Sequence, residues 1–365
     1  MPQPLLIHTE ASRGWGGQEM RTLAEARWFR DHDYRVEFIA RPDAGLTEAA
    51  EKLGFTVHKR LLRKNTQLAD FSFCRKLFKE LRPHMIGTHS NIDSRVCLAA
   101  ATFAGVPHRI RYRHVSIPVK PSPWNHIIYR KFATKIVTTA ESIAEPLRKH
   151  FKLSEDNAVS VPTGIAEPEN LISRDDARAA LIKELELPDE TRFIGQVSVL
   201  RGWKGHHDVM TAFDKIHRDH PNHHLIFAGG GPGLVSLPRE SEQYSCFKKI
   251  HFLGHRDDPW PIFRALEIAT LASTKGEGVP QSGMQAMLSG SAFVGTTVGG
   301  IPEIIEDDVS GILVPPEDPD ALSEALNRLV TETETRNRLT EKAREWALDH
   351  TSLDSMGNRI ISLMS

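Results

Sequence analysis

Residues 276–303 combine one carboxylate, one amide side chain and two glycine turns in an order that could build a polar ligand site. Gly276 opens a turn that carries Glu277, and a stretch of small residues places Gln285 eight positions further on. An apolar run at 292–294 follows and leads into a second glycine turn. Glycine lets backbones approach closely, and short apolar runs suit buried strands. The stretch therefore predicts loop, helix, strand, loop and helix, with polar groups offered where backbones come close.

Two further turns combine glycines with charge or with the start of a helix. Arg201 and Lys204 stand three residues apart in a turn that contains glycine. Two such cations could hold a diphosphate and neutralise the charge that develops as a bond to it breaks. Gly16 and Gly17 lie between an apolar run and a helical pattern, where free N–H groups suit a phosphate. Solvated loop charge and a tight turn without ligand are the plainer alternatives.

Histidines follow two of the predicted strands. His114 lies just past one strand in a basic stretch, and His89 and Ser90 end the strand before it. In an open parallel sheet such positions share the edge where ligands bind. A surface histidine in a basic loop is the alternative for His114.

The remaining histidines and cysteines do not favour a metal site. The pairs at 206–207 and 223–224 are adjacent and point apart on regular structure, and no His-x-x-x-His comes with a carboxylate partner. Cys74, Cys97 and Cys246 lack Cys-x-x-Cys spacing. We therefore expect no metal and no disulfide framework.

Short apolar runs alternate with amphipathic stretches along the chain, which is typical of parallel sheets with helices on both faces. In the first half we predict strands at 5–9, 35–40, 85–88, 109–112, 136–139 and 158–161, with helices at 18–29 and 68–81. In the second half we predict strands at 193–200, 224–228, 250–253, 268–272 and 292–295, with helices at 208–217, 260–266, 284–288 and 336–349. Residues 162–168, with two prolines and a glycine, separate the halves.

Length and composition indicate a two-domain globular protein. A chain of 365 residues exceeds one ordinary core. We find no apolar run of roughly 20 residues that could span a bilayer. The first residues lack the basic region and the long apolar stretch of a signal peptide. We therefore expect a cytoplasmic protein.

Charge is distributed unevenly between the halves. Residues 1–163 hold 26 Lys and Arg against 16 Asp and Glu, a balance of +10, whereas the whole chain carries −1. Seven cations are interleaved with four aromatic residues: Arg109, Arg111, Arg113, Lys120, Arg130, Lys131 and Lys135 with Tyr112, Trp124, Tyr129 and Phe132. Basic groups beside aromatics suit an anionic membrane or a phosphorylated glycan. Helix packing and solvated charge are the alternative, and no recognition motif favours nucleic acid.

The stretch at 276–303 resembles the signature of family 4 glycosyltransferases of the GT-B fold, Glu-Gly-x-Pro, Glu-Ala-Met-Ala-x-Gly and Gly-Gly-x-Pro-Glu. Gln285 stands where the family usually has its second Glu. The resemblance covers nearly the whole chain and is loosest in residues 1–160. It implies an α/β protein of two Rossmann-like domains facing across a cleft. Residues 1–163 would bind the acceptor, with a C-terminal helix at about 350–365 packing back on them, and residues 164–349 would bind the nucleotide-sugar.

The resemblance also implies an activity. The expected reaction is retaining, metal-independent transfer from a UDP- or GDP-sugar, without a cofactor. The expected acceptor is a hydroxyl of a cell-envelope glycan or glycolipid, of lipopolysaccharide or exopolysaccharide type. The protein would act in the cytoplasm, with peripheral contact to the inner face of the membrane. A GT-B epimerase or phosphorylase, and a catalytically silent sugar-binding subunit suggested by Gln285, remain alternatives.

The family's site residues carry over by motif position. Glu277, His114, Lys204 and Arg201, the last from a different offset than usual, would act in catalysis. The donor would be bound by Gly16, Gly17, Gly230, Gly254, His255, Arg256, Gly278, Val279, Pro280, Gln281, Ser282 and Gln285. The acceptor side would be lined by His89, Ser90 and Arg113.

Overall fold

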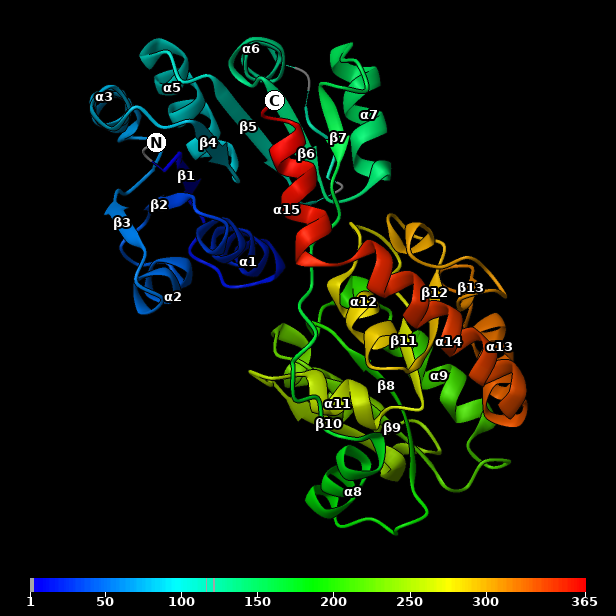
Figure 1. Cartoon of the computed structure of the whole chain (residues 1–365). Coiled ribbons are helices and arrows are strands. Elements are labelled where there is room, and N and C mark those ends of the chain that lie inside the picture. The colour runs from blue at the N-terminus through cyan, green and yellow to red at the C-terminus, as the bar shows by residue number, and fades with distance from the viewer. Residues whose placement is uncertain (1–2, 116, 121) are drawn as a thin grey trace. The chain divides into compact units, whose positions relative to one another are not determined.

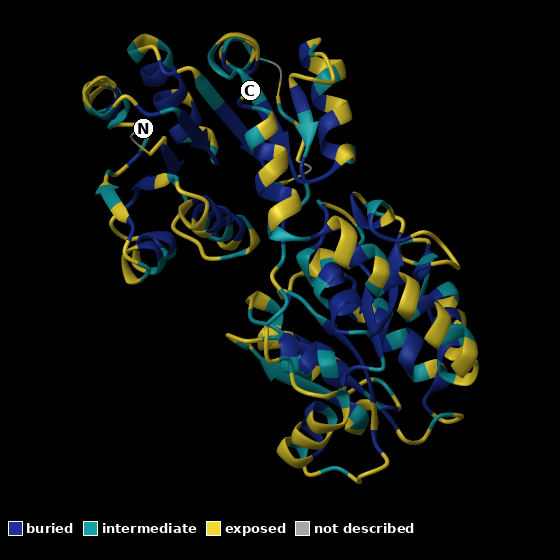
Figure 2. Ribbon diagram, viewed as in Figure 1, coloured by how far each residue is buried: buried dark blue, intermediate teal, exposed yellow. Residues whose placement is uncertain are grey.

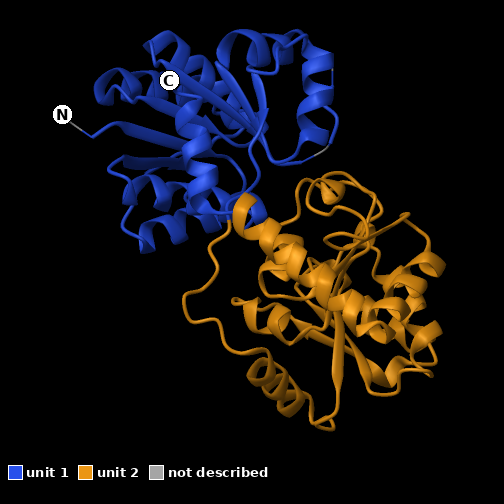
Figure 3. Cartoon of the chain, turned by 45° about the vertical axis from the view of Figure 1, so that its right-hand side comes forward, with its two compact units in different colours: residues 1–164, 351–365 blue, residues 165–350 orange. Residues whose placement is uncertain are grey.

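The computed structural model describes residues 3–115, 117–120 and 122–365. The chain forms two compact units, residues 1–164 with 351–365, and residues 165–350 (Figure 3). Each unit is a parallel sheet with helices between its strands (Figure 1).

The first unit holds a seven-stranded parallel sheet in the order β3-β2-β1-β4-β5-β6-β7. Its strands are β1 (Leu5–Glu10), β2 (Arg35–Ala40), β3 (Thr56–Lys59), β4 (Met85–Thr88), β5 (His108–Arg113), β6 (Lys135–Thr138) and β7 (Ala158–Ser160). Its helices are α1 (Gly17–Asp31), α2 (Gly45–Lys52), α3 (Gln67–Leu81), α4 (Asn91–Asp93), η1 (Ser94–Leu98), α5 (Ala99–Ala104), α6 (Pro123–Ile127), η2 (Ile128–Phe132), α7 (Glu141–Phe151) and α15 (Leu353–Ser362).

The second unit holds a six-stranded parallel sheet in the order β10-β9-β8-β11-β12-β13. Its strands are β8 (Arg192–Val197), β9 (His223–Ala228), β10 (Ile250–Gly254), β11 (Ile268–Leu271), β12 (Ala292–Thr296) and β13 (Ile312–Val314). Its helices are α8 (Arg174–Leu185), η3 (Gly202–Lys204), α9 (His206–Ile216), η4 (Pro232–Leu234), α10 (Ser236–Ser241), η5 (Phe247–Lys249), α11 (Trp260–Ala265), α12 (Gln281–Leu288), η6 (Ile301–Glu303), α13 (Pro319–Thr331) and α14 (Thr333–His350).

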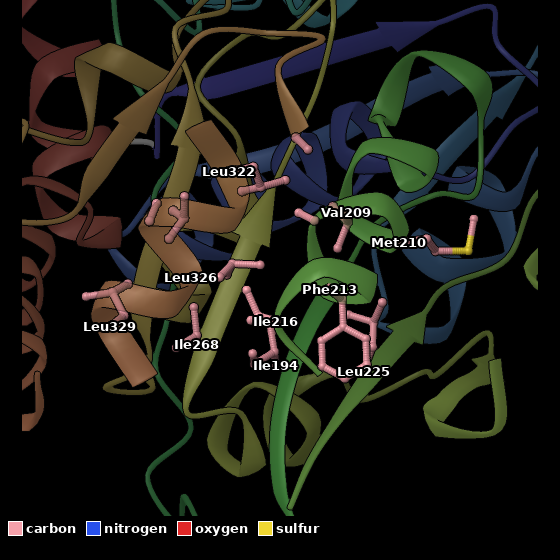
Figure 4. Packing of buried hydrophobic residues seen from close by; sticks show 14 of the residues in the cluster. Ile194, Val209, Met210, Phe213, Ile216, Leu225, Ile268, Leu322, Leu326 and Leu329 are labelled. Atoms are coloured by element: carbon pink, nitrogen blue, oxygen red, sulfur yellow. The ribbon is translucent and has the colours of Figure 1, made fainter. Parts of the chain in front are cut away.

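Apolar side chains spaced by three or four residues bury one face of each main helix. On α9, Val209, Phe213 and Ile216 pack with Ile194 of β8 and Leu326 of α13 (Figure 4). The outer faces of the helices are exposed, whereas most of the strands are buried (Figure 2). This is expected for a parallel sheet, because helices cover both of its faces. The packing holds the strand ends of the second unit in fixed positions.

Several details differ from the sequence prediction, and the helices α8 and α13 of the second unit were not predicted. The strand predicted at 193–200 ends at Val197, because its partner β9 ends at Ala228 and turns away at Gly229, whose φ is +147°. The strands β3 and β13 were not predicted; β3 is a partly exposed edge strand, and β13 has only three residues. The helix predicted at 336–349 begins earlier, at Thr333.

The chain returns to the first unit through α15. Met356 and Ile360 of α15 are buried in the core of that unit, and Trp28 of α1 donates its indole N–H to Asp354 at 2.6 Å. Gly357 lies against the Trp28 ring, where an added Cβ would come within 2.2 Å of a ring atom. A side chain at this position would therefore push α15 away from α1.

Gly357→Ala is expected to lower the free energy of unfolding of the first unit by about 1–3 kcal/mol, because overpacking forces side chains and backbone to shift. Denaturant unfolding followed by tryptophan fluorescence measures this. Asn358→Ala, on the exposed neighbouring position of the same helix, is the control and should be nearly neutral. Equal stability of the two variants would contradict the packing described for α15.

Among the described residues, helices that combine a membrane-spanning length with sufficient apolarity do not occur.

Candidate active site

The order of strands in the second sheet fixes where a ligand can enter. The strands β8 and β11 are neighbours in the sheet. The chain passes from β8 to β9 on one side and from β11 to β12 on the other side. The loops that follow β8 and β11 therefore diverge at the carboxyl ends of these two strands. Crevices at such reversal points are the usual ligand sites of open α/β sheets. Residues 198–205 and 272–280 form these two loops.

Lys204 and Glu277 meet between these two loops. Lys204 Nζ donates a hydrogen bond to Glu277 Oε1 and forms an ion pair with it. Ser273 Oγ donates to the same oxygen at 2.5 Å. The Glu277 residue is only 7% exposed. A buried, paired carboxylate of this kind keeps its position and its charge-assisted hydrogen bonds.

Backbone contacts hold the two loops together. The buried Gln196 of β8 donates to the carbonyl of Lys204 at 2.8 Å and accepts from the N–H of Ala272 at 3.1 Å. Gly205 has a φ of +67°, and a Cβ there would lie 1.8 Å from the Ala272 carbonyl oxygen. Gly299 approaches the backbone of Glu277 in the same way, since a Cβ added at Gly299 would lie 2.1 Å from the Glu277 carbonyl oxygen. Glycine is therefore required by close approach at both positions.

The predicted donor loop leads directly into a helix. Val279 and Pro280 are buried, and Pro280 is the N-cap of α12. The first N–H groups of a helix have no partner within it, so those of Gln281 and Ser282 face outward from the start of α12. Gln285 lies one turn further on the same face and is partly buried. The carboxylate, the loop amides and the Gln285 amide thus belong to one continuous segment.

The other predicted donor residues with charged or ring side chains differ in how exposed they are and in whether they pair with another protein residue. The Arg201 guanidinium is exposed and lies 5.3 Å from the ring centre of Trp203, so it is not paired with Glu277. His255 is exposed and lies beside Gly230, since a Cβ added at Gly230 would lie 3.5 Å from the Cβ of His255. Arg256 forms an ion pair with Glu184 of α8, which commits its guanidinium to the protein.

The turns of Gly230 and Gly254 do lie side by side. Gly229 donates its N–H to the carbonyl of Gly254 at 2.8 Å. The carbonyl of Gly230 accepts from the N–H of Leu200 at 2.8 Å, which ties the turn to the loop after β8. These glycine turns therefore border the same strand ends as Lys204.

In the first unit, the predicted acceptor residues gather at the carboxyl ends of β4 and β5. His89 Nδ1 lies 2.9 Å from His114 Nε2. Arg113 is 8% exposed and donates to the carbonyl of Ile117 at 2.5 Å. Ser90 caps α4 and donates its hydroxyl to Asp93 at 2.7 Å. Ser90 therefore has a structural role in addition to any ligand contact.

Gly16 and Gly17 open α1 as predicted from the sequence, with Gly16 at the N-cap. The neighbouring carboxylate was not predicted. Glu10, at the end of β1, accepts from the N–H of Ser12 at 2.7 Å and from the amide of Gln18. Burial, with Asp93 nearby, raises the pKa of Glu10 to about 7, so its negative charge is partly lost near neutral pH.

Asp214, His217 and Cys246 form the one cluster of potential metal ligands found among the described residues. The cluster has internal partners: Asp214 accepts from the N–H of Cys246 and the hydroxyl of Ser245, both at 2.8 Å. His217 Nδ1 lies 2.8 Å from the Asp214 carbonyl oxygen. These contacts tie the turn at residues 244–247 to α9. The expectation of a metal-independent protein remains a prediction.

Comparison with known proteins agrees with the arrangement in both units. The family model for glycosyltransferase family 4 matches residues 15–167, and the model for glycosyl transferases group 1 matches residues 177–346. The chain belongs to glycosyltransferase family 4. Its two parallel sheets, matched over nearly the whole chain by solved structures described as glycosyltransferases, confirm the predicted GT-B fold.

One curated relative of this family 4 member is the D-inositol 3-phosphate glycosyltransferase of Corynebacterium glutamicum. The two sequences are 28% identical over 244 residues, which are 62% of this chain and 57% of the relative. The chain thus spans little more than half the length of that relative.

Solved structures match the fold more completely. A glycosyltransferase from Rickettsia africae has a TM-score of 0.87 at 17% identity, covering 100% of this chain and 98% of its own. The HepE protein of Anabaena in complex with UDP has a TM-score of 0.84 at 18% identity, covering 99% of both chains.

Several polar residues near the candidate acceptor residues of the first unit or the candidate donor residues of the second were not identified from the sequence of this family 4 member. They are His8, Glu10, Glu25, Asp93, Gln196 and Ser273, all buried. The available signal was a histidine and a glutamate within the otherwise apolar run at 5–10, which was interpreted only as a buried strand. Partners such as Glu25 lie in helical patterns that give no such signal.

Proposed function

We propose that the protein is a retaining, metal-independent glycosyltransferase that moves a sugar from a nucleotide-diphospho-sugar to a hydroxyl of a cell-envelope glycan or glycolipid. The observation that carries the proposal is the ion pair between the buried Glu277 and the partly exposed Lys204 at the reversal point of the second sheet. A carboxylate there can hold the hydroxyls of the donor sugar. The lysine beside it can meet the negative charge of the leaving diphosphate.

The surroundings of the pair supply the other interactions that such a donor needs. The N–H groups of the first turn of α12 lie at the positive end of the helix dipole, where phosphates bind favourably. Gln285 stands one turn along the same helix face, and its amide oxygen can accept a ribose hydroxyl. Solved structures of similar fold are described in complex with UDP and with UDP-glucose, which supports a nucleotide-sugar donor.

The acceptor class rests on the names of similar proteins and on charge. One solved structure of similar fold is a lipopolysaccharide outer core galactosyltransferase, and one curated relative is a phosphatidylinositol monomannoside mannosyltransferase. Both names describe envelope glycans or glycolipids. The basic balance of residues 1–163 supports an anionic acceptor or acceptor-bearing surface.

Incubation with separate UDP-, GDP- and ADP-sugars, with and without membrane-derived glycolipid, tests the proposal. We expect nucleotide release from one donor that depends on the glycolipid and retains the anomeric configuration. EDTA should change the rate less than twofold, because Lys204 and the loop amides take the place of a metal. Release without acceptor would indicate an epimerase or phosphorylase, and binding without release a silent subunit. Either result, or strong inhibition by EDTA, would contradict the proposal.

Fewer basic and aromatic residues of the first unit are exposed for contact with anionic lipid than the sequence implied. Arg111 and Arg113, two of the cations that were considered for contact with an anionic partner, are buried, as are the interleaved Tyr112 and Tyr129. Other members remain exposed: Trp124 at 59%, with Lys120, Arg130 and Lys131. Exposed Ile117 extends this group, which is a smaller surface than the one predicted.

The protein should therefore co-sediment with vesicles of anionic lipid at low salt and stay in the supernatant at high salt, because salt screens the electrostatic attraction. Reversal of Lys120, Arg130 and Lys131 to Glu should weaken the attachment at least about threefold, a modest estimate for exposed charges near an anionic surface. Reversal of three exposed cations of the second unit, Lys183, Arg218 and Lys248, is the control. Equal loss in both variants, or no binding by the wild type, would contradict a specific surface on the first unit.

A further inference from the structure

Three histidines from three neighbouring strands of the first sheet form a continuous line. His8 lies in β1, His89 follows β4, and His114 follows β5, and these strands are adjacent and parallel (Figure 1). His8 Nδ1 lies 3.0 Å from His89 Nε2, and His89 Nδ1 lies 2.9 Å from His114 Nε2. Gly87 of β4 leaves the required space, because a Cβ there would lie 2.9 Å from His8 Nδ1.

The line runs from the protein interior to the candidate acceptor site. His8 is fully buried, His89 is 3% exposed, and His114 is partly exposed. Burial lowers the pKa of His8 to about 3. Burial and neighbouring positive groups also hold the pKa values of His89 and His114 well below the usual value. All three rings are therefore neutral near pH 7, with one N–H and one lone pair each.

Neutral rings joined in this way allow only two arrangements of protons. In one, every N–H points toward the interior, so His114 carries its proton on Nε2 and turns the lone pair of Nδ1 toward solvent. In the other, every N–H points outward, and His114 presents Nδ1–H instead. The group at the inner end of the line decides between them, since each N···N hydrogen bond needs one donor and one acceptor.

Glu25 of α1 stands at that inner end. Its Oε1 lies 3.8 Å from His8 Nε2, which is longer than a hydrogen bond but close enough for a charge–dipole attraction between two fully buried groups. Oε1 also accepts the hydroxyl of Tyr112. Among the described residues, His8 Nε2 and Glu25 Oε2 have no hydrogen-bond partner, so nothing else competes for this end of the line.

Two other polar groups, Arg21 and Thr22, lie beside the line. Arg21 Nε lies 3.9 Å from Glu25 Oε2 and favours its ionised form. Thr22 Oγ1 lies 3.3 Å from His89 Nδ1, and its hydroxyl donates to the carbonyl of Gln18 at 2.9 Å. Taken alone, this longer contact favours Nδ1–H on His89 and thus the outward arrangement. The Glu25 carboxylate opposes it from the inner end of the line.

We propose that Glu25 is a positioning residue that acts through His8 and His89 to hold His114 as the Nε2–H tautomer, leaving Nδ1 as an acceptor for a substrate hydroxyl. The substrate part of this inference rests on the proposed glycosyltransferase function. The link from Glu25 to the His114 tautomer does not depend on it. Glu25 itself touches no substrate, because it is buried behind His8.

Long-range ¹H–¹⁵N spectra of the histidine-labelled full chain test the link directly. Burial raises the pKa of Glu25 to about 7, so pH 8 keeps the carboxylate ionised. The His114 signals are assigned by their loss in His114→Gln. The wild type should show His114 with a bare Nδ1. Glu25→Gln, which keeps the size and removes the charge, should give a mixture of tautomers or the Nδ1–H form.

Two further variants make the test decisive. His8→Asn breaks the line between Glu25 and His89 and should change the His114 tautomer in the same way, including in the event that Glu25→Gln does not fold. Glu37→Gln is the matched control, because Glu37 is a buried carboxylate of the same unit that pairs with His58 at 2.7 Å. That control should leave the His114 signals unchanged.

Kinetics then test the substrate part. Glu25→Gln should lower kcat at least about tenfold, which is less than the roughly 10²-fold or more expected for losing a general acid or base itself, with the KM for the donor changed less than twofold. A wild-type His114 protonated on Nδ1, or a tautomer unchanged in both Glu25→Gln and His8→Asn, would overturn the inference. A tautomer that follows Glu25 in a protein without transferase activity would instead remove the proposed function and leave the link from Glu25 to His114 intact.

Discussion

Glu277→Ala is expected to lower kcat for sugar transfer by about 10³-fold or more, while the affinity for the free nucleotide changes little. The carboxylate is assigned to the donor sugar, whose contacts matter most in the transition state, so its loss falls on kcat rather than on ground-state binding. Glu277→Gln, which keeps the hydrogen bond from Ser273 but removes the charge beside Lys204, should retain slightly more activity. Steady-state assays and calorimetric titration with UDP and GDP measure the two quantities.

Glu267→Gln is the matched control for this prediction. Glu267 precedes β11, at the opposite end of the strand from Glu277, and it also pairs with a cation, Arg336, at 2.7 Å. Its removal should affect stability without affecting transfer. Wild-type turnover by Glu277→Ala, or an equal loss in Glu267→Gln, would remove Glu277 from the mechanism.

Lys204→Ala is expected to weaken nucleotide binding by about 1–3 kcal/mol, the range for a lost charge-assisted hydrogen bond to phosphate. Removing this lysine also leaves the buried Glu277 carboxylate without its cation, which should lower the melting temperature of the second unit. The double variant Lys204→Ala/Glu277→Ala should recover part of that stability but none of the affinity. Calorimetry and thermal unfolding separate the two effects.

Two other variants complete the test of the donor site. Arg201→Ala should weaken binding by about 1 kcal/mol, less than Lys204→Ala, because its guanidinium is exposed and screened. Gln285→Glu, which restores the usual family residue, should leave affinity equal or improved. Unchanged nucleotide binding in both cation variants would mean that the donor site lies elsewhere.

Much of the fold followed from the sequence because its signals are local. Alternation of apolar runs with amphipathic stretches predicted two parallel sheets, and the comparisons confirm the GT-B fold. Some errors fall where the local signal is weak: β3 is half exposed, β13 has three residues, and the end of β8 depends on where its partner turns away. The helix α13 was missed although its apolar residues recur at helical spacing. The candidate donor segment could also be identified from the sequence, because residues 277–285 are consecutive along the chain.

What the sequence by itself determined is the family, the fold class and the types of side chain available at the strand ends, because each is encoded in short motifs or in hydrophobic period. Only the tertiary structure decided which of these side chains meet. Lys204 and Glu277 are 73 positions apart, and His8 and His89 are 81 apart. Such pairs exist because parallel strands distant in sequence end at one edge of a sheet, and no local pattern specifies which strands become neighbours.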